Sequence, residues 1–123
     1  MKKTRPIQSD ATGVTSWFRA ARVSDFPADG GACVRYRHLQ IAVFNFAKRN
    51  EWYACQNQCP HKMQMVLSRG LIGSQAGEPK VACPFHKRTF SLKSGQCLNA
   101  EEDQITVFPV KVEDGFVFIG VPE

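Results

Sequence analysis

The stretch Val-Lys-Val-Glu-Asp-Gly-Phe-Val-Phe-Ile at positions 110–119 decides the fold class. Runs rich in β-branched and aromatic residues lie on both sides of Asp114-Gly115. An Asp-Gly pair between two such runs is a strong signal for the two-residue turn that joins antiparallel strands. The sequence therefore predicts a β-hairpin over residues 110–119.

Similar runs recur upstream, separated by residues typical of turns. We expect further strands at 15–23, 32–36, 39–46, 51–55, 80–82, 89–92 and 105–108. The turn signals include a cluster of Asp, Pro and Gly over 25–31 and the tripeptide Lys48-Arg49-Asn50. No stretch of ten or more residues shows a helical period. The pattern predicts an all-β protein, a small antiparallel sandwich or barrel.

Length and charge fit one soluble domain. The chain has 123 residues and a net charge of +5, and its basic residues are spread along it as a solvated surface, which does not favour nucleic-acid binding. The longest run without charge or turn signals spans about nine residues, far short of the roughly 20 apolar residues that cross a membrane.

The N-terminus and the cysteines indicate the compartment. Met1-Lys2-Lys3 resembles the start of an export signal, but the residues that follow are polar. Five cysteines, an odd number, do not suit a disulfide scaffold. We therefore expect a cytoplasmic protein with a flexible tail at 1–14 and one domain at 15–123.

Residues 56–98 depart from the strand pattern. Long segments rich in Pro, Gly, Cys, His and Lys separate short strand candidates there, and the segment holds two of the three histidines. Long irregular segments in a small domain are usually functional. We expect an inserted subdomain at about 56–98.

Two short motifs in this subdomain pair a cysteine with a histidine. Cys59-Pro-His61 and Cys83-Pro-Phe-His86 are separated by 21 residues. Together they offer two sulfur and two nitrogen ligands, the set of a Rieske [2Fe–2S] cluster, in which two Cys hold one iron and two His hold the other. A mononuclear zinc site uses the same ligand types and is the main alternative, although structural zinc sites usually group Cys with Cys.

The wider sequence resembles the small subunit of the cytoplasmic NAD(P)H-dependent nitrite reductase, a family of Rieske proteins. The resemblance covers roughly residues 15–121 and rests on the two motifs with their surroundings, which are Val-Leu-Ser-Arg-Gly-Leu-Ile-Gly at 66–73, Gly-Glu-Pro-Lys-Val-Ala-Cys-Pro-Phe-His-Lys at 77–87, Ser-Gly-Gln-Cys-Leu at 94–98 and Phe-Pro-Val-Lys-Val-Glu-Asp-Gly at 108–115.

The resemblance implies a Rieske-like antiparallel β-sandwich or barrel with an inserted cluster-binding subdomain. Cys59 and Cys83 would hold one iron of a [2Fe–2S] cluster, and His61 and His86 the other. Gly95 would shape the turn after the second cluster loop. Phe90 stands where high-potential Rieske proteins have a hydroxyl donor, so we expect a low redox potential.

The implied role is electron transfer in assimilatory reduction of nitrite to ammonium. The partner would be a large subunit that carries flavin, a further iron–sulfur cluster and sirohaem. Catalytic residues are expected there, because this chain lacks a Gly-x-Gly-x-x-Gly fingerprint for a dinucleotide. The alternative is a free Rieske ferredoxin that serves a ring-hydroxylating oxygenase.

Several other residues have expected places. Cys33, Cys55 and Cys97 are expected to be small buried hydrophobes. Trp17, Trp52 and Tyr53 are expected in the core. Met63 and Met65 flank the first motif, where they either pack over the cluster or form a docking surface.

Overall fold

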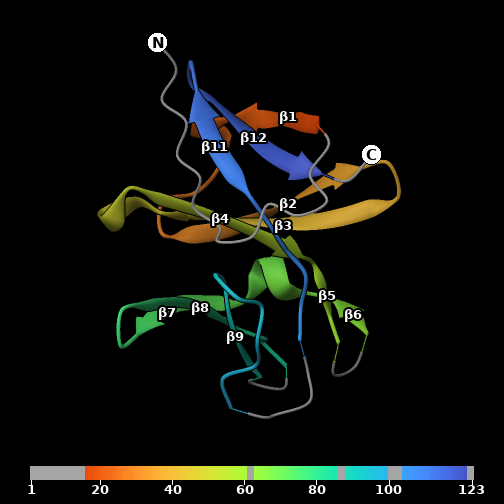
Figure 1. The fold of residues 1–123 in the computed structure, drawn as a ribbon, viewed down its shortest axis with the longest axis vertical. Helices are drawn as coiled ribbons and strands as arrows, with labels where there is room; N and C mark the ends of the chain where they lie inside the picture. Colours follow the sequence, from red (N-terminus) through yellow and green to blue (C-terminus); the bar gives the residue numbers. More distant parts are fainter. Residues whose placement is uncertain (1–15, 61–62, 86–87, 100–103, 122–123) are drawn as a thin grey trace.

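A computed structural model describes residues 16–60, 63–85, 88–99 and 104–121 of the chain. The regular elements among these residues are β-strands and short 3-10 turns, joined by turns and loops (Figure 1). No helix in the described ranges is long and apolar enough to cross a membrane. The expected tail at 1–14 lies outside the described residues.

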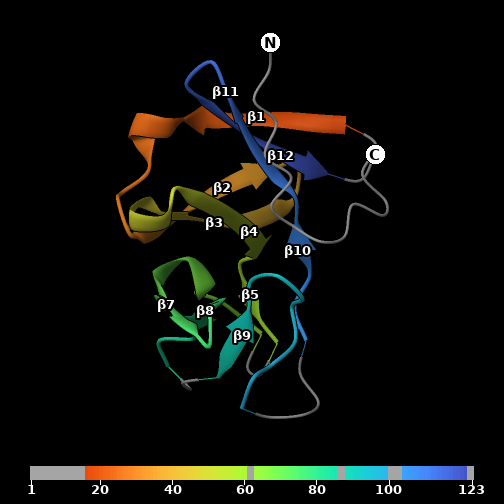
Figure 2. The ribbon, with the colours of Figure 1, turned by 60° about the vertical axis from the view of Figure 1, so that its left-hand side comes forward.

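The chain builds three layers. The upper sheet has the order β1-β12-β11, and the middle sheet has the order β10-β4-β3-β2. Below the middle sheet lies a hairpin lobe, which comprises β5 to β9 (Figures 1 and 2). The strands of the two sheets are β1 (Ser16–Arg22), β2 (Gly30–Tyr36), β3 (Leu39–Phe46), β4 (Glu51–Gln56), β10 (Val107–Phe108), β11 (Val110–Glu113) and β12 (Phe116–Val121).

The hairpin lobe is built from short antiparallel pairs. Its strands are β5 (Gln58–Cys59), β6 (Gln64–Met65), β7 (Leu71–Gln75), β8 (Glu78–Ala82) and β9 (Thr89–Ser91). The 3-10 turns of the molecule are η1 (Val23–Asp25), η2 (Ala47–Arg49) and η3 (Leu67–Arg69). The turn η3 lies between β6 and β7 and joins the two hairpins of the lobe.

The middle sheet separates two hydrophobic cores because its side chains alternate between its faces. Ile41 and Val43 of β3 belong to the upper core, which lies against the upper sheet. Ala42 and Phe44, which alternate with them, belong to the lower core, which lies against the hairpin lobe. Residues 41–44 are therefore all buried. A strand buried on both faces is apolar throughout, which is why this stretch shows no polar alternation.

The all-β prediction is confirmed, and so is the hairpin at 110–119. Val112 lies opposite Val117 in the antiparallel pair β11–β12. Asp114 and Gly115, at φ 53° and 81°, have the left-handed backbone that a tight hairpin turn requires.

Two local expectations were wrong. Gly31, expected in a turn, lies in β2. A Cβ added at Gly31 would lie 2.7 Å from the carbonyl oxygen of Ser68, so the absent side chain lets η3 approach the sheet. Strand β7 was not predicted, because Leu-Ile-Gly-Ser-Gln shows little alternation and contains glycine.

Gly95 is the turn glycine with the least room. Its φ is 84°, and an added Cβ would lie 2.1 Å from the carbonyl oxygen of Ile105. Its N–H also donates to Ser91 O, and its C=O accepts from the Ile105 N–H. The position therefore needs glycine for both its backbone conformation and its space.

We predict that Gly95→Ala destabilises the protein far more than Gly115→Ala, which is the matched control. Gly115 has φ 81° with no atom within 4 Å of an added Cβ, so that change costs only the left-handed backbone term of about 1–2 kcal/mol. Gly95→Ala should cost roughly 1–3 kcal/mol beyond this. Urea unfolding measures both values, and equal losses would contradict the steric argument.

Candidate metal centre

The first motif begins in the hairpin that β5 forms with β6. Cys59 lies opposite Gln64 in this pair, and the Met63 N–H donates to Cys59 O at 2.7 Å. Met63 has φ 60°, a left-handed backbone that turns the chain back sharply. The loop from Cys59 to Met63 is thus closed at its base by one backbone hydrogen bond.

The second motif has the same construction. The pair Ala82–Thr89 ends the ladder between β8 and β9. Beyond it, the Cys83 N–H donates to Arg88 O at 2.8 Å. Each of the two predicted cysteine ligands is therefore the first residue of a loop that a backbone hydrogen bond closes.

Both cysteines lie in the lower core. Their exposed fractions are 0% for Cys59 and 1% for Cys83, and both belong to the same cluster of buried apolar side chains. Sequence-distant hairpins thus deliver two thiols into one water-poor environment. Thiolate sulfur is the donor type that iron–sulfur clusters and zinc require, so this half of the donor set fits the predicted metal centre.

The other half of the donor set lies outside the described residues. His61 and His86 occupy positions within the two closed loops, but the structure does not describe residues 61–62 and 86–87. The assignment of both histidines, and with it the complete ligand set, stays a prediction from sequence.

A buried hydroxyl holds the segment behind the second loop. Ser91 is 0% exposed, and its Oγ donates to Glu78 Oε2. The same Oγ accepts hydrogen bonds from the backbone N–H groups of Lys93 and Ser94, both at 3.1 Å. The network ties β8, β9 and the Gly95 turn together. Nothing in the sequence marks this network, because Ser-Leu-Lys-Ser carries no signal for a buried polar group.

The remaining cysteines differ from one another. Cys55 is fully buried, and this burial raises the pKa of its thiol far above the ordinary value. Its place in the core confirms the expectation for that residue. Cys97 is half-buried, with its Sγ 3.3 Å from Asn99 Oδ1.

The expectation for Cys33 was wrong, because its thiol is exposed on β2. Partial burial nevertheless raises its pKa, and a backbone hydrogen bond from Ile41 offsets part of that rise. Neither Cys33 nor Cys55 therefore offers a ready thiolate.

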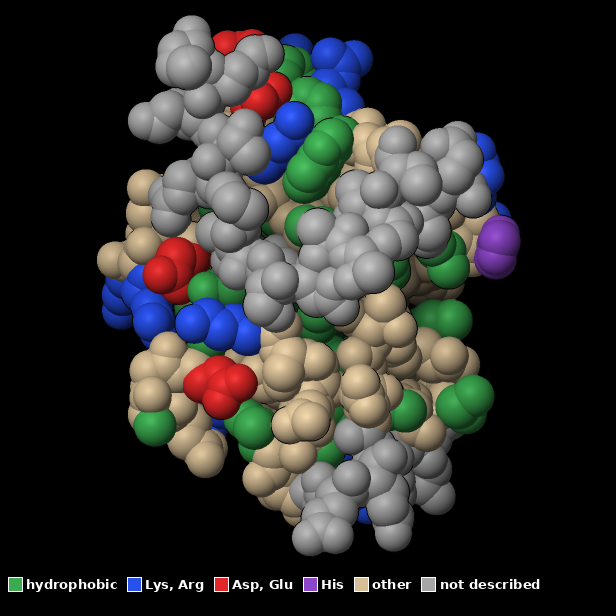
Figure 3. All heavy atoms as spheres, viewed as in Figure 1, with side chains coloured by type: hydrophobic (Ala, Val, Ile, Leu, Met, Phe, Trp, Pro, Cys, Tyr) green, Lys and Arg blue, Asp and Glu red, His purple; other side chains and the backbone are tan. Residues whose placement is uncertain are grey.

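Large exposed hydrophobic side chains gather near the two loops. Among the described residues, Met63 is 65% exposed, Met65 45%, Phe85 58% and Leu71 78%. Leu71 lies opposite Ala82, next to Cys83. Figure 3 shows hydrophobic side chains at the surface of the lower half of the molecule. Met63 and Met65 thus lie at the surface, a position open both to packing over a cluster and to a docking surface, the two expected roles.

Aromatic residues of the sheets divide between core and surface. Trp52 and Tyr53 are buried as expected. The expectation for Trp17 was wrong, because it is 38% exposed on β1, at the end of the molecule opposite the hairpin lobe (Figure 1). Lys111 Nζ lies 4.6 Å from the centre of its ring, a cation–π contact that suits an exposed indole.

Comparison with known proteins places the chain in a family. The model of the Rieske-like [2Fe-2S] domain matches residues 16–120. The chain is 31% identical over 104 residues to the nitrite reductase (NADH) small subunit of Escherichia coli K12, which covers 85% of this chain and 96% of that protein. It is 41% identical over 101 residues to the nitrite reductase [NAD(P)H] of Emericella nidulans, covering 78% of this chain but only 9% of that longer protein.

A solved structure and a ferredoxin relative support the same family. A putative NADH-dependent nitrite reductase small subunit from Mycobacterium tuberculosis superimposes with a TM-score of 0.81 at 25% identity, covering 88% of this chain and 96% of that one. The chain is also 40% identical over 106 residues to the 3-phenylpropionate/cinnamic acid dioxygenase ferredoxin subunit of Escherichia coli O139:H28, covering 85% and 92%. From the match over residues 16–120 and these relatives, we conclude that the chain belongs to the Rieske-like [2Fe-2S] domain family.

Proposed function

We propose that the chain is the electron-transfer subunit of an NAD(P)H-dependent nitrite reductase that forms ammonium. Its cluster would be held by Cys59 and Cys83 on one iron and by His61 and His86 on the other. The observation that carries the proposal is the convergence of two closed loops on one core, with both cysteines buried in it. Similarity to a small subunit over 96% of that subunit's length supports the choice of enzyme.

The cluster, when bound, supplies a site that accepts and releases one electron. The residues of this chain bind it and control its surroundings. Cys59 and Cys83 would keep their sulfur atoms away from water, because the lower core encloses both side chains. Phe90 is fully buried in the same core and has no hydroxyl to donate to a cluster sulfur. We therefore expect a potential near the lower end of the Rieske range of about −150 to +300 mV.

The exposed apolar side chains indicate the surface at which a redox partner would dock for electron transfer. Met63, Phe85 and Leu71 lie on or beside the two ligand loops, and large exposed apolar groups clustered on a small domain mark an interaction site. We infer that this end of the molecule faces a large subunit. The nitrite-reducing centre, with flavin, iron–sulfur cluster and sirohaem, would lie on that partner, in the cytoplasm.

A second candidate is a diffusible ferredoxin, which the similarity to a dioxygenase ferredoxin subunit favours. Purification from the native host separates the two. A stable complex with a sirohaem protein supports the nitrite reductase subunit, and a lone electron donor that reduces a ring-hydroxylating oxygenase supports the ferredoxin.

The ligand assignment predicts that Cys59→Ser and Cys83→Ser each abolish the Rieske EPR signal of the reduced, anaerobically purified protein, because each removes a thiolate from one iron. Cys55→Ala is the matched control, since Cys55 lies in the same core but is not assigned as a ligand, and it should keep the signal. Iron analysis should give about two irons per chain in the wild type.

Two outcomes contradict this assignment. A full Rieske spectrum in Cys83→Ser would show that the ligand set is wrong. One zinc per chain, without colour or EPR signal, would favour the mononuclear zinc site.

If Met63, Phe85 and Leu71 form the docking surface for the large subunit, Phe85→Ala should weaken binding to the purified large subunit. We expect a loss of about fivefold or more, which corresponds to roughly 1 kcal/mol. The matched control is Trp17→Ala, an exposed aromatic at the far end of the molecule, which should leave the Kd unchanged. Titration calorimetry measures both. A larger loss in Trp17→Ala would place the interface on the upper sheet instead.

We predict that Cys33 and Cys55, which are not assigned as ligands, are alkylated slowly in the folded protein. Only the thiolate reacts with iodoacetamide, and Cys33 has a raised pKa, so at pH 7.5 it should react more slowly than an ordinary thiol. Its rate should climb as the pH rises through 9. Cys55 should stay unmodified until the protein unfolds. Mass spectrometry of timed samples tests this, and fast labelling of Cys33 at pH 7.5 would argue against the raised pKa.

A further inference from the structure

The first ligand loop depends on how the hairpin lobe is attached to the middle sheet. The lobe begins where the chain leaves β4 at Gln56 and passes through Asn57 into β5. Among the residues that the structure describes, Asn57 and Ser91 are the buried polar ones, at 2% and 0% exposed. Ser91 bonds within the lobe, whereas Asn57 bonds across the boundary between lobe and sheet.

Asn57 is bonded on both sides of that boundary. Toward the sheet, its backbone N–H donates to Gln40 O at 3.0 Å, and its side-chain Nδ2 donates to Gln40 Oε1 at 3.1 Å. Toward η3, its C=O accepts from the Leu67 N–H at 3.0 Å, and its Oδ1 accepts from the Ser68 N–H at 2.7 Å. A backbone N–H only donates, so the oxygen of the amide must face Ser68.

The turn η3 is held from both sides as a result. Ser68 O lies so close to the Cα of Gly31 that a Cβ there would come within 2.7 Å. The opposite end of the same residue is fixed by Asn57 Oδ1. Only Val66 separates β6 from η3. Asn57 therefore bonds to the sheet just before Cys59 and to the turn that follows the first ligand loop.

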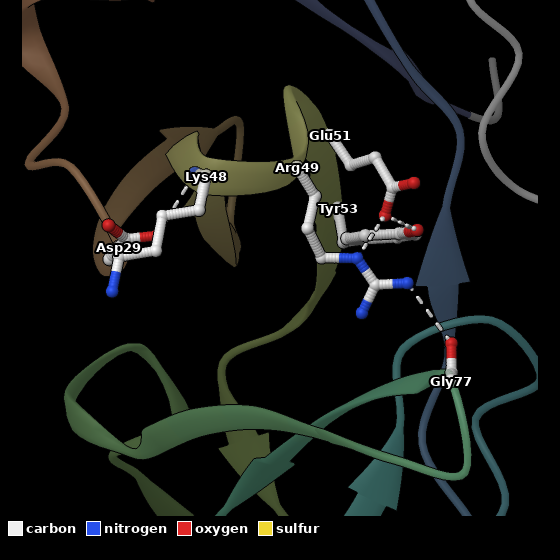
Figure 4. Close-up of polar contacts among 6 residues, drawn as sticks. All are labelled: Asp29, Lys48, Arg49, Glu51, Tyr53 and Gly77. Carbon is white, nitrogen blue, oxygen red and sulfur yellow. Dashed lines mark hydrogen bonds and ion pairs between the residues drawn. The ribbon is translucent and has the colours of Figure 1, made fainter.

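The polar link that Arg49 makes across this boundary is more exposed. Figure 4 shows Arg49 extending from η2 toward the β7–β8 turn, where Nη2 donates to Gly77 O at 3.2 Å. That link is solvent-exposed and borders an open cleft of about 310 Å³, lined in part by Lys48 and Ile72. A hydrogen bond shared with water stabilises less than one inside the core, so the buried Asn57 fixes the lobe more firmly than Arg49 does.

We propose that Asn57 is a positioning residue that holds the first ligand loop, and with it Cys59, in register with the middle sheet. Its hydrogen bonds run to Gln40 on the sheet and to the backbone N–H groups of Leu67 and Ser68, so it acts through the chain on either side of the loop. The effect on the metal centre rests on the proposed function, because it requires that Cys59 hold the cluster. Groups that hydrogen-bond a metal ligand directly change metal affinity by about 10- to 100-fold when removed, and we expect an effect near the lower end of that range for Asn57, because it acts through the backbone.

The experiment compares three variants. Asn57→Ala removes the side-chain amide, and Gln40→Ala removes only its acceptor on the sheet. Asn45→Ala is the matched control, because Asn45 is an asparagine of β3, the same strand as Gln40. For each we measure the EPR line shape of the reduced protein, the rate of iron loss to a chelator, the thermal midpoint, and hydrogen exchange of the Leu67 and Ser68 amides.

We expect Asn57→Ala to broaden the EPR lines, to lose iron about 10-fold faster and to speed exchange at Leu67 and Ser68. Gln40→Ala should change all three in the same direction by a smaller factor, and Asn45→Ala should change none. If Asn57→Ala does not fold, Gln40→Ala decides the question: iron loss and exchange at control rates would overturn the proposal.

Two further outcomes are separable. A lower thermal midpoint in Asn57→Ala with wild-type EPR lines, iron loss and exchange would show a merely structural residue and overturn the proposal. A wild-type protein without a Rieske signal would overturn the proposed function instead. Exchange at Leu67 and Ser68 would then still show whether Asn57 holds the loop, and unchanged exchange in Asn57→Ala would reject it.

Discussion

Burial of the middle sheet on both faces is the constraint on which the two halves of the molecule depend. Ile41 and Val43 complete one core and Ala42 and Phe44 the other, so a single strand holds the upper sheet and the hairpin lobe together. Each core therefore includes side chains of this strand, and neither is complete without them. A polar substitution at any of these positions would leave an unsatisfied group between the layers.

The proposed metal centre depends on the same arrangement. The strands β5 and β6 have two residues each, and isolated hairpins of that length are not stable in water. They pack instead against the lower core, which includes Cys59, and Asn57 joins the chain beside them to the middle sheet. Ser91 has the matching position behind the second loop, where it joins β8 and β9. The loops therefore present rigid thiols at their bases while large apolar side chains stay exposed nearby.

Features set by local chemistry could be predicted from the sequence, and features set by distant partners could not. The turn at Asp114-Gly115 follows from two adjacent residues, and the shared core of Cys59 and Cys83 agrees with two motifs from which a common metal site is predicted. Asn57 depends on Gln40, 17 residues away, and on Ser68, 11 residues away, so nothing beside it in the sequence marks it as buried. Trp17 and Cys33 looked apolar enough for a core, but their strands turn them outward, which only the three-layer packing decides.

The hairpin lobe enters and leaves the sheet at one point. The Gln56 N–H donates to Thr106 O at 2.9 Å, and the Thr106 N–H donates to Gln56 Oε1 at 2.8 Å across 50 residues of chain. The segment between Gln56 and Thr106 is thus an insertion whose two ends are hydrogen-bonded to each other, next to the pairing of β4 with β10. Changes of length inside this insertion leave the register of the sandwich untouched, as for other insertions whose ends lie side by side. The frame of the two sheets can thus stay constant while the loops of the hairpin lobe vary.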